Sequence, residues 1–309
     1  MRRQCLLFLI YCSILLSGTA LQLVAQNGPY SFVHYGTEQG LSNDHINNIV
    51  RDRPGFIWVG TTSGLNRFDG RRFRVFKHDL KTPNSLPGDY ISGLVTGPDG
   101  WLWVSTNQGL CRLDPERLRF EPVLLPGDRD SAAADHLVGK TVFDSRGRAW
   151  VNGQKALYCV DLKSGRTQVY KPAVTPHQPY PVLIDHYDNI WLLANSRLYR
   201  FDPHTHKTYP YPDDTTKMNA MHVVEDQQHE IWMTTWEKGL YRYNRTTDKL
   251  EQQVDGATLG LNRQILPDVT PDGRPFFWVG GGLSGLFLYF PDTRFKQDLP
   301  YDYRDPFTH

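Results

Sequence analysis

Six tryptophan residues recur along the chain at nearly regular intervals. The intervals are 45, 47, 41, 41 and 46 residues, with a mean of 44. A period of this length is typical of a β-propeller, in which each repeat forms one four-stranded blade. The sequence therefore predicts an all-β protein with six blades in this chain. The periodic residues are Trp58, Trp103, Trp150, Trp191, Trp232 and Trp278.

Each periodic tryptophan lies within the same order of short segments. An apolar segment such as 46–50 comes first, and a turn rich in Asp, Pro and Gly follows it. The tryptophan segment then leads through a polar loop and a Gly-Leu pair, Gly64-Leu65 in the first repeat, into two further segments. Four strands joined by hairpin turns explain this order. The predicted blades cover residues 41–78, 86–123, 136–171, 180–210, 219–252 and 264–299.

One blade cannot bury both faces of its own sheet, so neighbouring blades must stack around an axis. We therefore expect the periodic tryptophans to lie in the core between blades rather than in a ligand site. Trp101 and Trp236 fall outside the period. Trp101 and Trp236 are therefore not required for the packing between blades and could have another role.

The N-terminal segment differs from the rest of the chain. Met1-Arg2-Arg3 is basic, an apolar run follows, and small residues precede possible cleavage sites after Ala20 and Ala25. This order predicts a signal peptide over residues 1–25 and a mature propeller over residues 26–309. An uncleaved anchor is the alternative, but the apolar run is shorter than the about 20 residues that a spanning helix needs.

The mature chain keeps two of the four cysteines, Cys111 and Cys159. An exported protein could pair them. Their positions relative to equivalent leucines, Leu110 and Leu157, place the two side chains on opposite faces of equivalent strands. We therefore expect two unpaired thiols.

Charge is balanced along the chain. It has 34 Lys and Arg residues against 33 Asp and Glu residues, for a formal net charge of +1, with no long block of one sign. Such a chain produces no field that would recruit nucleic acid. We therefore do not expect this chain to bind nucleic acid.

The first two repeats resemble a known family. The segments 40–43, 52–61 and 64–70 closely resemble the two-component regulator propeller repeat. The segment 32–42, just after the predicted signal peptide, is similar to the usual opening of the periplasmic sensors of Bacteroidetes hybrid two-component systems. The resemblance extends over residues 30 to about 295 and is strongest in the first, second and fifth repeats.

The resemblance implies a periplasmic sensing module of a longer protein. In the family, such propellers precede an immunoglobulin-like domain, a membrane span, a histidine kinase, a receiver and a DNA-binding domain, none of which we find in this sequence. Kinase activity and a homodimeric state would belong to the parent protein. Gut members of the family sense glycans, so the resemblance implies an oligosaccharide ligand and control of polysaccharide utilisation.

No catalytic machinery, cofactor site or metal site is predicted. Asp44, Asp89 and Asp268 lie near the starts of inner strands, but their spacing does not define a catalytic carboxylate pair. His204 and His206 have no Cys or carboxylate cluster nearby. A secreted propeller enzyme, such as a glycosidase or lyase, and a protein-binding scaffold remain the alternatives to a sensor.

An aspartate recurs six residues before four of the periodic tryptophans. A calcium loop would need alternating Asp and Asn residues, which are absent, so we expect these carboxylates to cap turns. The four residues are Asp52, Asp144, Asp185 and Asp226.

Loops on one face are the expected ligand site, because a rigid scaffold commonly presents variable loops for recognition. This face carries the loops that join each blade to the next and the loops after each tryptophan strand. Aromatic and amide side chains there suit carbohydrate. The candidate residues are Tyr90, Asn107, Asn152, Asn195, His222 and Trp236.

The strand count predicts an incomplete propeller. Each of the six repeats supplies its own four strands, yet one more strand is predicted over residues 31–36. In propellers that close by pairing the two ends of the chain, such a strand forms the outer edge of the final blade. We therefore expect a seventh blade, which a C-terminal continuation would supply.

Overall fold

The computed structural model describes residues 33–82, 84–126, 139–153, 156–172, 180–194, 196–211, 218–259, 262–281 and 285–299. Within these residues, 24 strands form six antiparallel sheets of four strands each. The strands of every sheet follow one another in chain order, so each sheet is one blade. The predicted all-β propeller fold, with six blades in this chain, is confirmed.

The repeats supply the blades in sequence. Blades one and two consist of β1 (Ile46–Arg51), β2 (Ile57–Thr61), β3 (Gly64–Phe68) and β4 (Phe73–Phe76), then β5 (Ile91–Thr96), β6 (Leu102–Thr106), β7 (Gly109–Asp114) and β8 (Arg119–Val123). Blades three and four consist of β9 (Thr141–Phe143), β10 (Arg148–Asn152), β11 (Leu157–Asp161) and β12 (Thr167–Tyr170), then β13 (Tyr180–Ile184), β14 (Ile190–Ala194), β15 (Arg197–Asp202) and β16 (Lys207–Tyr211). Blades five and six consist of β17 (Ala220–Glu225), β18 (Ile231–Thr235), β19 (Leu240–Asn244) and β20 (Lys249–Val254), then β21 (Asn262–Val269), β22 (Pro275–Gly281), β23 (Gly285–Phe290) and β24 (Phe295–Asp298). The short helices η1 (Thr37–Gln39) and α2 (Gly256–Leu259) precede blades one and six.

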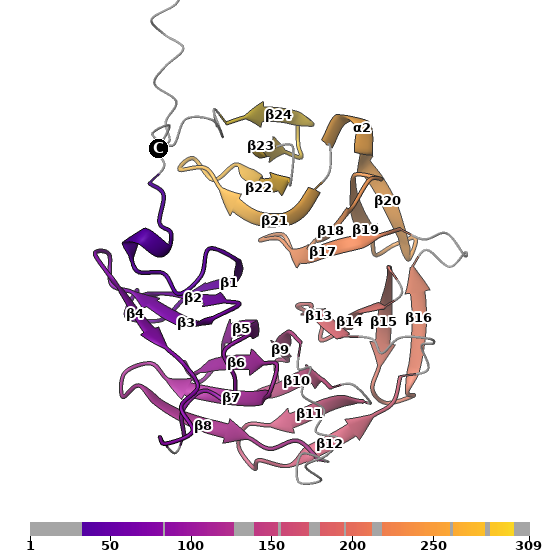
Figure 1. The fold of residues 1–309 in the computed structure, drawn as a ribbon. Coiled ribbons are helices and arrows are strands. Elements are labelled where there is room, and N and C mark those ends of the chain that lie inside the picture. The colour runs from indigo at the N-terminus through magenta and orange to yellow at the C-terminus, as the bar shows by residue number, and fades with distance from the viewer. Residues whose placement is uncertain are drawn as a thin grey trace, which may run out of the picture. The chain divides into compact units, whose positions relative to one another are not determined.

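The inner strands, the first of each blade, hold the ring together. β1 contacts β5, and the contacts continue from β5 to β9, β9 to β13, β13 to β17 and β17 to β21. Figure 1 shows these strands turned toward the centre while the fourth strands lie at the rim. The ring belongs to one compact unit, Tyr35–Gln297.

The periodic tryptophans lie in the second strand of each blade. Five of them are at most 4% exposed, whereas Trp278 of blade six is half-buried. The five buried residues each pack into a cluster that contains apolar side chains of the following blade. These residues are Trp58, Trp103, Trp150, Trp191 and Trp232.

The recurring aspartates cap the turns between first and second strands, as expected, and they also bind the tryptophans. Asp52 Oδ1 accepts hydrogen bonds from the backbone of Gly55 (2.9 Å) and Phe56 (2.8 Å), while Oδ2 accepts one from Trp58 Nε1 (2.7 Å). A buried indole N–H needs such an acceptor. The same indole bond forms at Asp144–Trp150 (2.9 Å), Asp185–Trp191 (3.1 Å) and Asp226–Trp232 (2.7 Å).

Cys111 and Cys159 are buried and unpaired, as expected. Burial raises the pKa of the Cys159 thiol to about 11 and also raises that of Cys111. Both thiols are therefore protonated at neutral pH and poorly reactive.

The leading strand expected over residues 31–36 is not formed in its described part. Residues 33–36 are irregular, and residues 31–32 lie outside the described residues. A strand needs a sheet edge to pair with, and each of the six sheets already draws its four strands from its own repeat. Among all the residues that the structure describes, no helix is long and apolar enough to cross a membrane.

Candidate functional site

The predicted ligand residues of blade two lie together. Tyr90 ends the loop that enters the blade, and Asn107 follows the tryptophan strand. The Asn107 backbone donates a 3.1 Å hydrogen bond to the Tyr90 carbonyl, and the Tyr90 side chain is exposed. The two loops of this face are thus joined within the blade.

Other predicted residues make the same kind of connection within their own blades. Asn152 Oδ1 accepts a 3.2 Å hydrogen bond from the Gly139 backbone, and the Trp236 backbone donates a 2.9 Å bond to the Asn219 carbonyl. Asn195 lies outside the described residues. Asn152 and Trp236 therefore help to hold the loops of this face.

His222 connects blades five and six at the inner strands. Its Nδ1 lies 3.2 Å from the carbonyl oxygen of Ile265. Equivalent hydrogen bonds join other blades. Asn47 Nδ2 of blade one donates to the carbonyl oxygen of Ile91 (2.9 Å), and Lys140 Nζ of blade three donates to the carbonyl oxygen of Val182 (3.0 Å). Burial, with the nearby Lys140 ammonium, lowers the pKa of His222 to about 4. This imidazole is therefore neutral at physiological pH and structural in its contacts.

The three carboxylates considered for catalysis have structural partners. Asp44 accepts hydrogen bonds from the Thr37 backbone (2.7 Å) and hydroxyl (3.1 Å), and Asp89 accepts one from the His78 backbone (2.7 Å). Asp268 accepts the Trp278 indole N–H at 2.9 Å. In the described part of the chain, no three His, Cys, Asp or Glu residues gather in a metal-binding arrangement.

A polar groove opens on the other face, between blades three and four. In a four-stranded antiparallel blade, the turns between strands one and two and between strands three and four share one end, opposite the predicted loops. The groove encloses about 460 Å³. Its lining residues are Asp144, Arg146, Arg148, Tyr187, Asp188, Asn189, Ile190, Arg200, Phe201, Asp202, Pro203, His204 and Tyr209.

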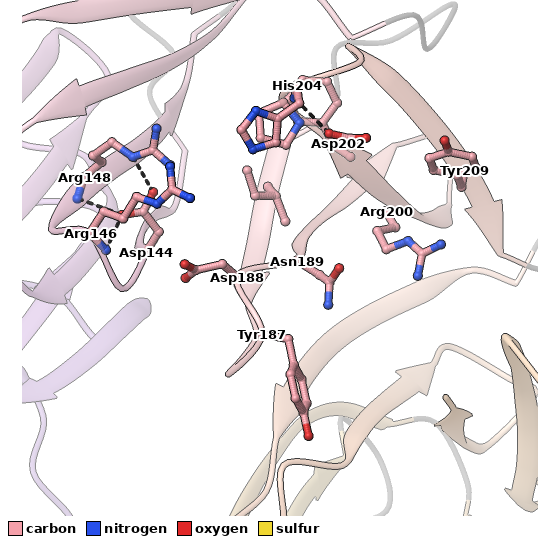
Figure 2. A pocket seen from close by; sticks show the side chains of 13 residues that line it. Asp144, Arg146, Arg148, Tyr187, Asp188, Asn189, Arg200, Asp202, His204 and Tyr209 are labelled. Atoms are coloured by element: carbon pink, nitrogen blue, oxygen red, sulfur yellow. Dashed lines mark hydrogen bonds and ion pairs between the residues drawn. The ribbon is translucent and has the colours of Figure 1, made fainter. Parts of the chain in front are cut away.

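Contacts between the two blades fix one wall of the groove. Asp188 of blade four accepts hydrogen bonds from the Ser145 backbone (2.9 Å) and hydroxyl of blade three. Arg148 Nε donates a 2.7 Å hydrogen bond to Asp144. Figure 2 shows Arg146 and Arg148 on the blade-three side, with Asp188 pointing toward them.

Blade four supplies the opposite wall. The Arg200 guanidinium lies 5.4 Å from the ring centroid of Tyr209, and Asp202 caps the adjacent turn by accepting from the His204 backbone (2.8 Å). Tyr187 is 62% exposed and Tyr209 is 41% exposed. Figure 2 shows Arg200, Asp202, His204 and Tyr209 on this side, whereas the Tyr187 side chain points away from them. Two exposed phenol rings thus lie among charged hydrogen-bonding groups.

Two carboxylates of the groove, Asp188 and Asp202, have a lowered pKa. Burial raises the pKa of Asp188, but the hydrogen bonds from Ser145 outweigh this and bring the pKa below its ordinary value. A hydrogen bond from the Thr205 hydroxyl lowers the pKa of Asp202. Three arginines face three aspartates in the lining, so the groove has no net charge when His204 is neutral. Such a site suits a neutral polar ligand with many hydroxyl groups.

One sequence feature distinguishes the blades that form this groove. The residue two before the periodic tryptophan is aromatic in blades one, two and six. It is polar in the other blades, and two of these polar residues, Arg148 and Asn189, line the groove.

Comparison with known proteins agrees with the repeat. Residues 40–63 and 85–108 match the family model described as "Two component regulator propeller". A histidine kinase of Formosa agariphila, "Histidine kinase P4", is 35% identical over 77 residues, which are 25% of this chain and 6% of the kinase.

Solved structures share the fold. The extracellular domains of two putative hybrid two-component systems from B. thetaiotaomicron superpose with TM-scores of 0.73 and 0.69, at 21% and 18% identity over 89% and 90% of this chain. The chain spans only 37% and 39% of those two domains. A virginiamycin B lyase from Staphylococcus aureus, solved with quinupristin, superposes with a TM-score of 0.57 at 14% identity over 76% of each chain. The chain is therefore a β-propeller whose first two blades carry the two-component regulator propeller repeat, and its fold resembles that of the extracellular domains of two putative hybrid two-component systems.

Proposed function

We propose that this chain is a periplasmic ligand-sensing module of a two-component system. In this proposal it binds an oligosaccharide and controls polysaccharide utilisation through a histidine kinase located elsewhere in a longer, dimeric protein. The family match and the structural likeness support the sensing role.

The groove between blades three and four supports the oligosaccharide. Exposed tyrosines offer apolar ring faces to a sugar, and neighbouring arginine and aspartate side chains donate to and accept from its hydroxyls. Its balanced charge favours neutral sugars over strongly acidic ones. The loop residues Tyr90, Asn107, Asn152, Asn195, His222 and Trp236 remain the competing site on the opposite face.

Titration calorimetry with a panel of plant and host oligosaccharides tests the proposal. We expect saturable binding by the chain and a several-fold loss of affinity in Tyr187→Ala, because ring stacking contributes about 1 kcal/mol. Tyr187→Phe keeps the ring and should bind nearly normally. Tyr90→Ala is the matched control on the opposite face.

Each outcome has a distinct meaning. If Tyr90→Ala loses affinity and Tyr187→Ala does not, the sugar binds the loop face and the groove assignment is wrong. If no oligosaccharide binds, the ligand class is wrong. Turnover of a bound sugar would favour the alternative of a secreted glycosidase or lyase, and binding of a protein alone would favour a scaffold.

A further inference from the structure

Two arginines lie opposite each other in the outer half of blade one. Arg67 of β3 pairs with Arg74 of β4 in the antiparallel register, so the two side chains lie on the same side of the blade. Trp58 of β2 pairs with Arg67 and packs against apolar side chains of blade two. The two arginines are therefore on the side of blade one that faces blade two.

The equivalent positions of two other blades hold an arginine and a carboxylate. In blade two, Arg112 pairs with Glu121, and Glu121 Oε2 accepts hydrogen bonds from Arg112 Nε (2.9 Å) and Nη2 (2.7 Å). In blade five, Arg242 pairs with Glu251. Blade one has arginine at both positions. Like charges directly opposite each other destabilise a sheet, and an anion bound between them would remove the repulsion.

The described part of the chain provides no such anion. No described carboxylate lies within ion-pair distance of Arg67 or Arg74, and neither side chain donates a hydrogen bond to a described residue. The neighbouring Asp69 accepts hydrogen bonds from the backbones of Arg71 and Arg72, both at 2.9 Å, and lies 3.6 Å from Arg72 Nε. This carboxylate therefore serves the turn and Arg72.

Aromatic rings hold both guanidinium groups. Arg67 Cζ lies 4.6 Å from the ring centroid of Phe56, and Arg74 Cζ lies 5.1 Å from that of Phe76. Both rings pack against the hydrophobic cluster that blades one and two share. A guanidinium that lies over a ring keeps the N–H groups in its own plane available to a ligand. Arg67 is half-buried and Arg74 is exposed, so a ligand can reach them from solvent.

We propose that Arg67 and Arg74 together bind one tetrahedral oxyanion, a phosphate or sulfate group. Each guanidinium presents a fork of N–H donors, and phosphate and sulfate carry oxygens in the geometry that such forks recognise. A tetrahedral group can offer oxygens to both forks at once, whereas one guanidinium can occupy both oxygens of a carboxylate. This site is separate from the groove between blades three and four and does not depend on the sugar proposed for that groove.

Titration of the 309-residue chain with inorganic phosphate at constant ionic strength tests the proposal, with the arginine Nε–H signals followed by NMR. Arg74→Glu reproduces the Arg112–Glu121 pair of blade two, so this variant should fold and lose the site. Arg74→Gln removes the charge without adding a carboxylate and provides a second variant. Arg166→Glu, in the exposed turn between β11 and β12, makes the same change of charge and is the control.

We expect saturable shifts of two arginine signals in the wild-type protein. Phosphate affinity should fall at least about tenfold in Arg74→Glu and several-fold in Arg74→Gln, and should stay within about twofold of the wild-type value in Arg166→Glu. Equal phosphate affinity in the wild-type protein and both Arg74 variants would show an adventitious ion only and overturn the proposal.

Inorganic sulfate and glucose 6-phosphate, titrated in the same way, distinguish the sources of the group. Tighter binding of glucose 6-phosphate than of phosphate would support an ester carried on a sugar. Binding of phosphate or sulfate that is as tight or tighter would support the free anion. If none of the three compounds gives saturable shifts, the proposed site is wrong.

Discussion

Gly97 occupies the position at which four other blades place the aspartate that binds their periodic tryptophan. An ideal Cβ on Gly97 would lie 3.2 Å from Trp103 Nε1. That buried indole nitrogen has no hydrogen-bond partner among the described residues. The turn has the same backbone hydrogen bond as in blade one. The Gly97 N–H donates to the Trp101 carbonyl, as the Asp52 N–H donates to the Phe56 carbonyl. Blade two therefore has the turn without the carboxylate.

Gly97→Asp should stabilise the protein by about 1 kcal/mol, since it supplies the missing acceptor. The new side chain would displace Asp99 Oδ1, which lies 2.7 Å from the ideal Cβ, but Asp99 is exposed and can rotate. Gly97→Ala makes the same steric demand without the acceptor and is the matched control. Urea unfolding should rank Asp above Ala; equal stabilities would contradict the hydrogen-bond account.

Asp52→Ala should destabilise the protein by about 2 to 4 kcal/mol, because it leaves the Trp58 indole and two turn N–H groups without their acceptor. Asp99→Ala, which removes an exposed turn carboxylate, should cost less than about 1 kcal/mol. The free energy of unfolding from urea titrations checks both values. Similar losses in the two variants would show that the carboxylate serves the turn alone.

The recurring aspartates have one role that the sequence predicts and one that it does not. Their recurrence six residues before tryptophan predicted the turn caps, because capping is a local interaction. The bond to the indole depends on the position of a side chain on the next strand, which spacing alone does not reveal. In blade six the same indole hydrogen bond forms at a different spacing. Asp268 lies ten residues before Trp278, because the hairpin between the two strands is longer.

Trp103→Ala should destabilise the fold by about 3 to 5 kcal/mol, because it empties a large aromatic site in the core. Trp236 lies in the loop after β18 and is half-buried, so Trp236→Ala should cost less than about half of that. Calorimetric and urea unfolding of the two variants provide the comparison. Equal losses would mean that Trp236 belongs to the core.

His222 should make the stability of the fold depend on pH. The folded-state pKa is about 4, against an ordinary value of 6.5. Below pH 6.5 the unfolded chain takes up a proton on this ring, and the folded chain does not do so until pH 4 is approached. Stability should therefore fall by about 1 to 3 kcal/mol between pH 6.5 and 4, with no effect above this range.

His222→Gln isolates this contribution, because glutamine can still donate to the Ile265 carbonyl but does not titrate. Urea unfolding at several pH values should show the wild-type protein losing stability relative to His222→Gln as the pH falls. Parallel pH profiles for the two proteins would rule out a buried neutral imidazole.

The polar groove was harder to predict than the fold. Regular spacing of tryptophans determines blades because each blade must bury its faces against its neighbours. The groove arises instead where Asp188 of one turn binds Ser145 of another, 43 residues away. Both are ordinary turn residues, so their types gave no reason to prefer one face of the ring.

We propose that the chain binds an oligosaccharide without altering it. The most direct measurement is a time course of one-dimensional proton NMR spectra of an oligosaccharide that binds the chain, recorded with catalytic and then stoichiometric amounts of protein. We expect broadened or shifted sugar signals at stoichiometric protein and an unchanged set of sugar species over days. New anomeric or unsaturated-sugar signals that grow with time, and that disappear in Asp44→Asn, Asp89→Asn or Asp268→Asn, would show an enzyme and contradict it.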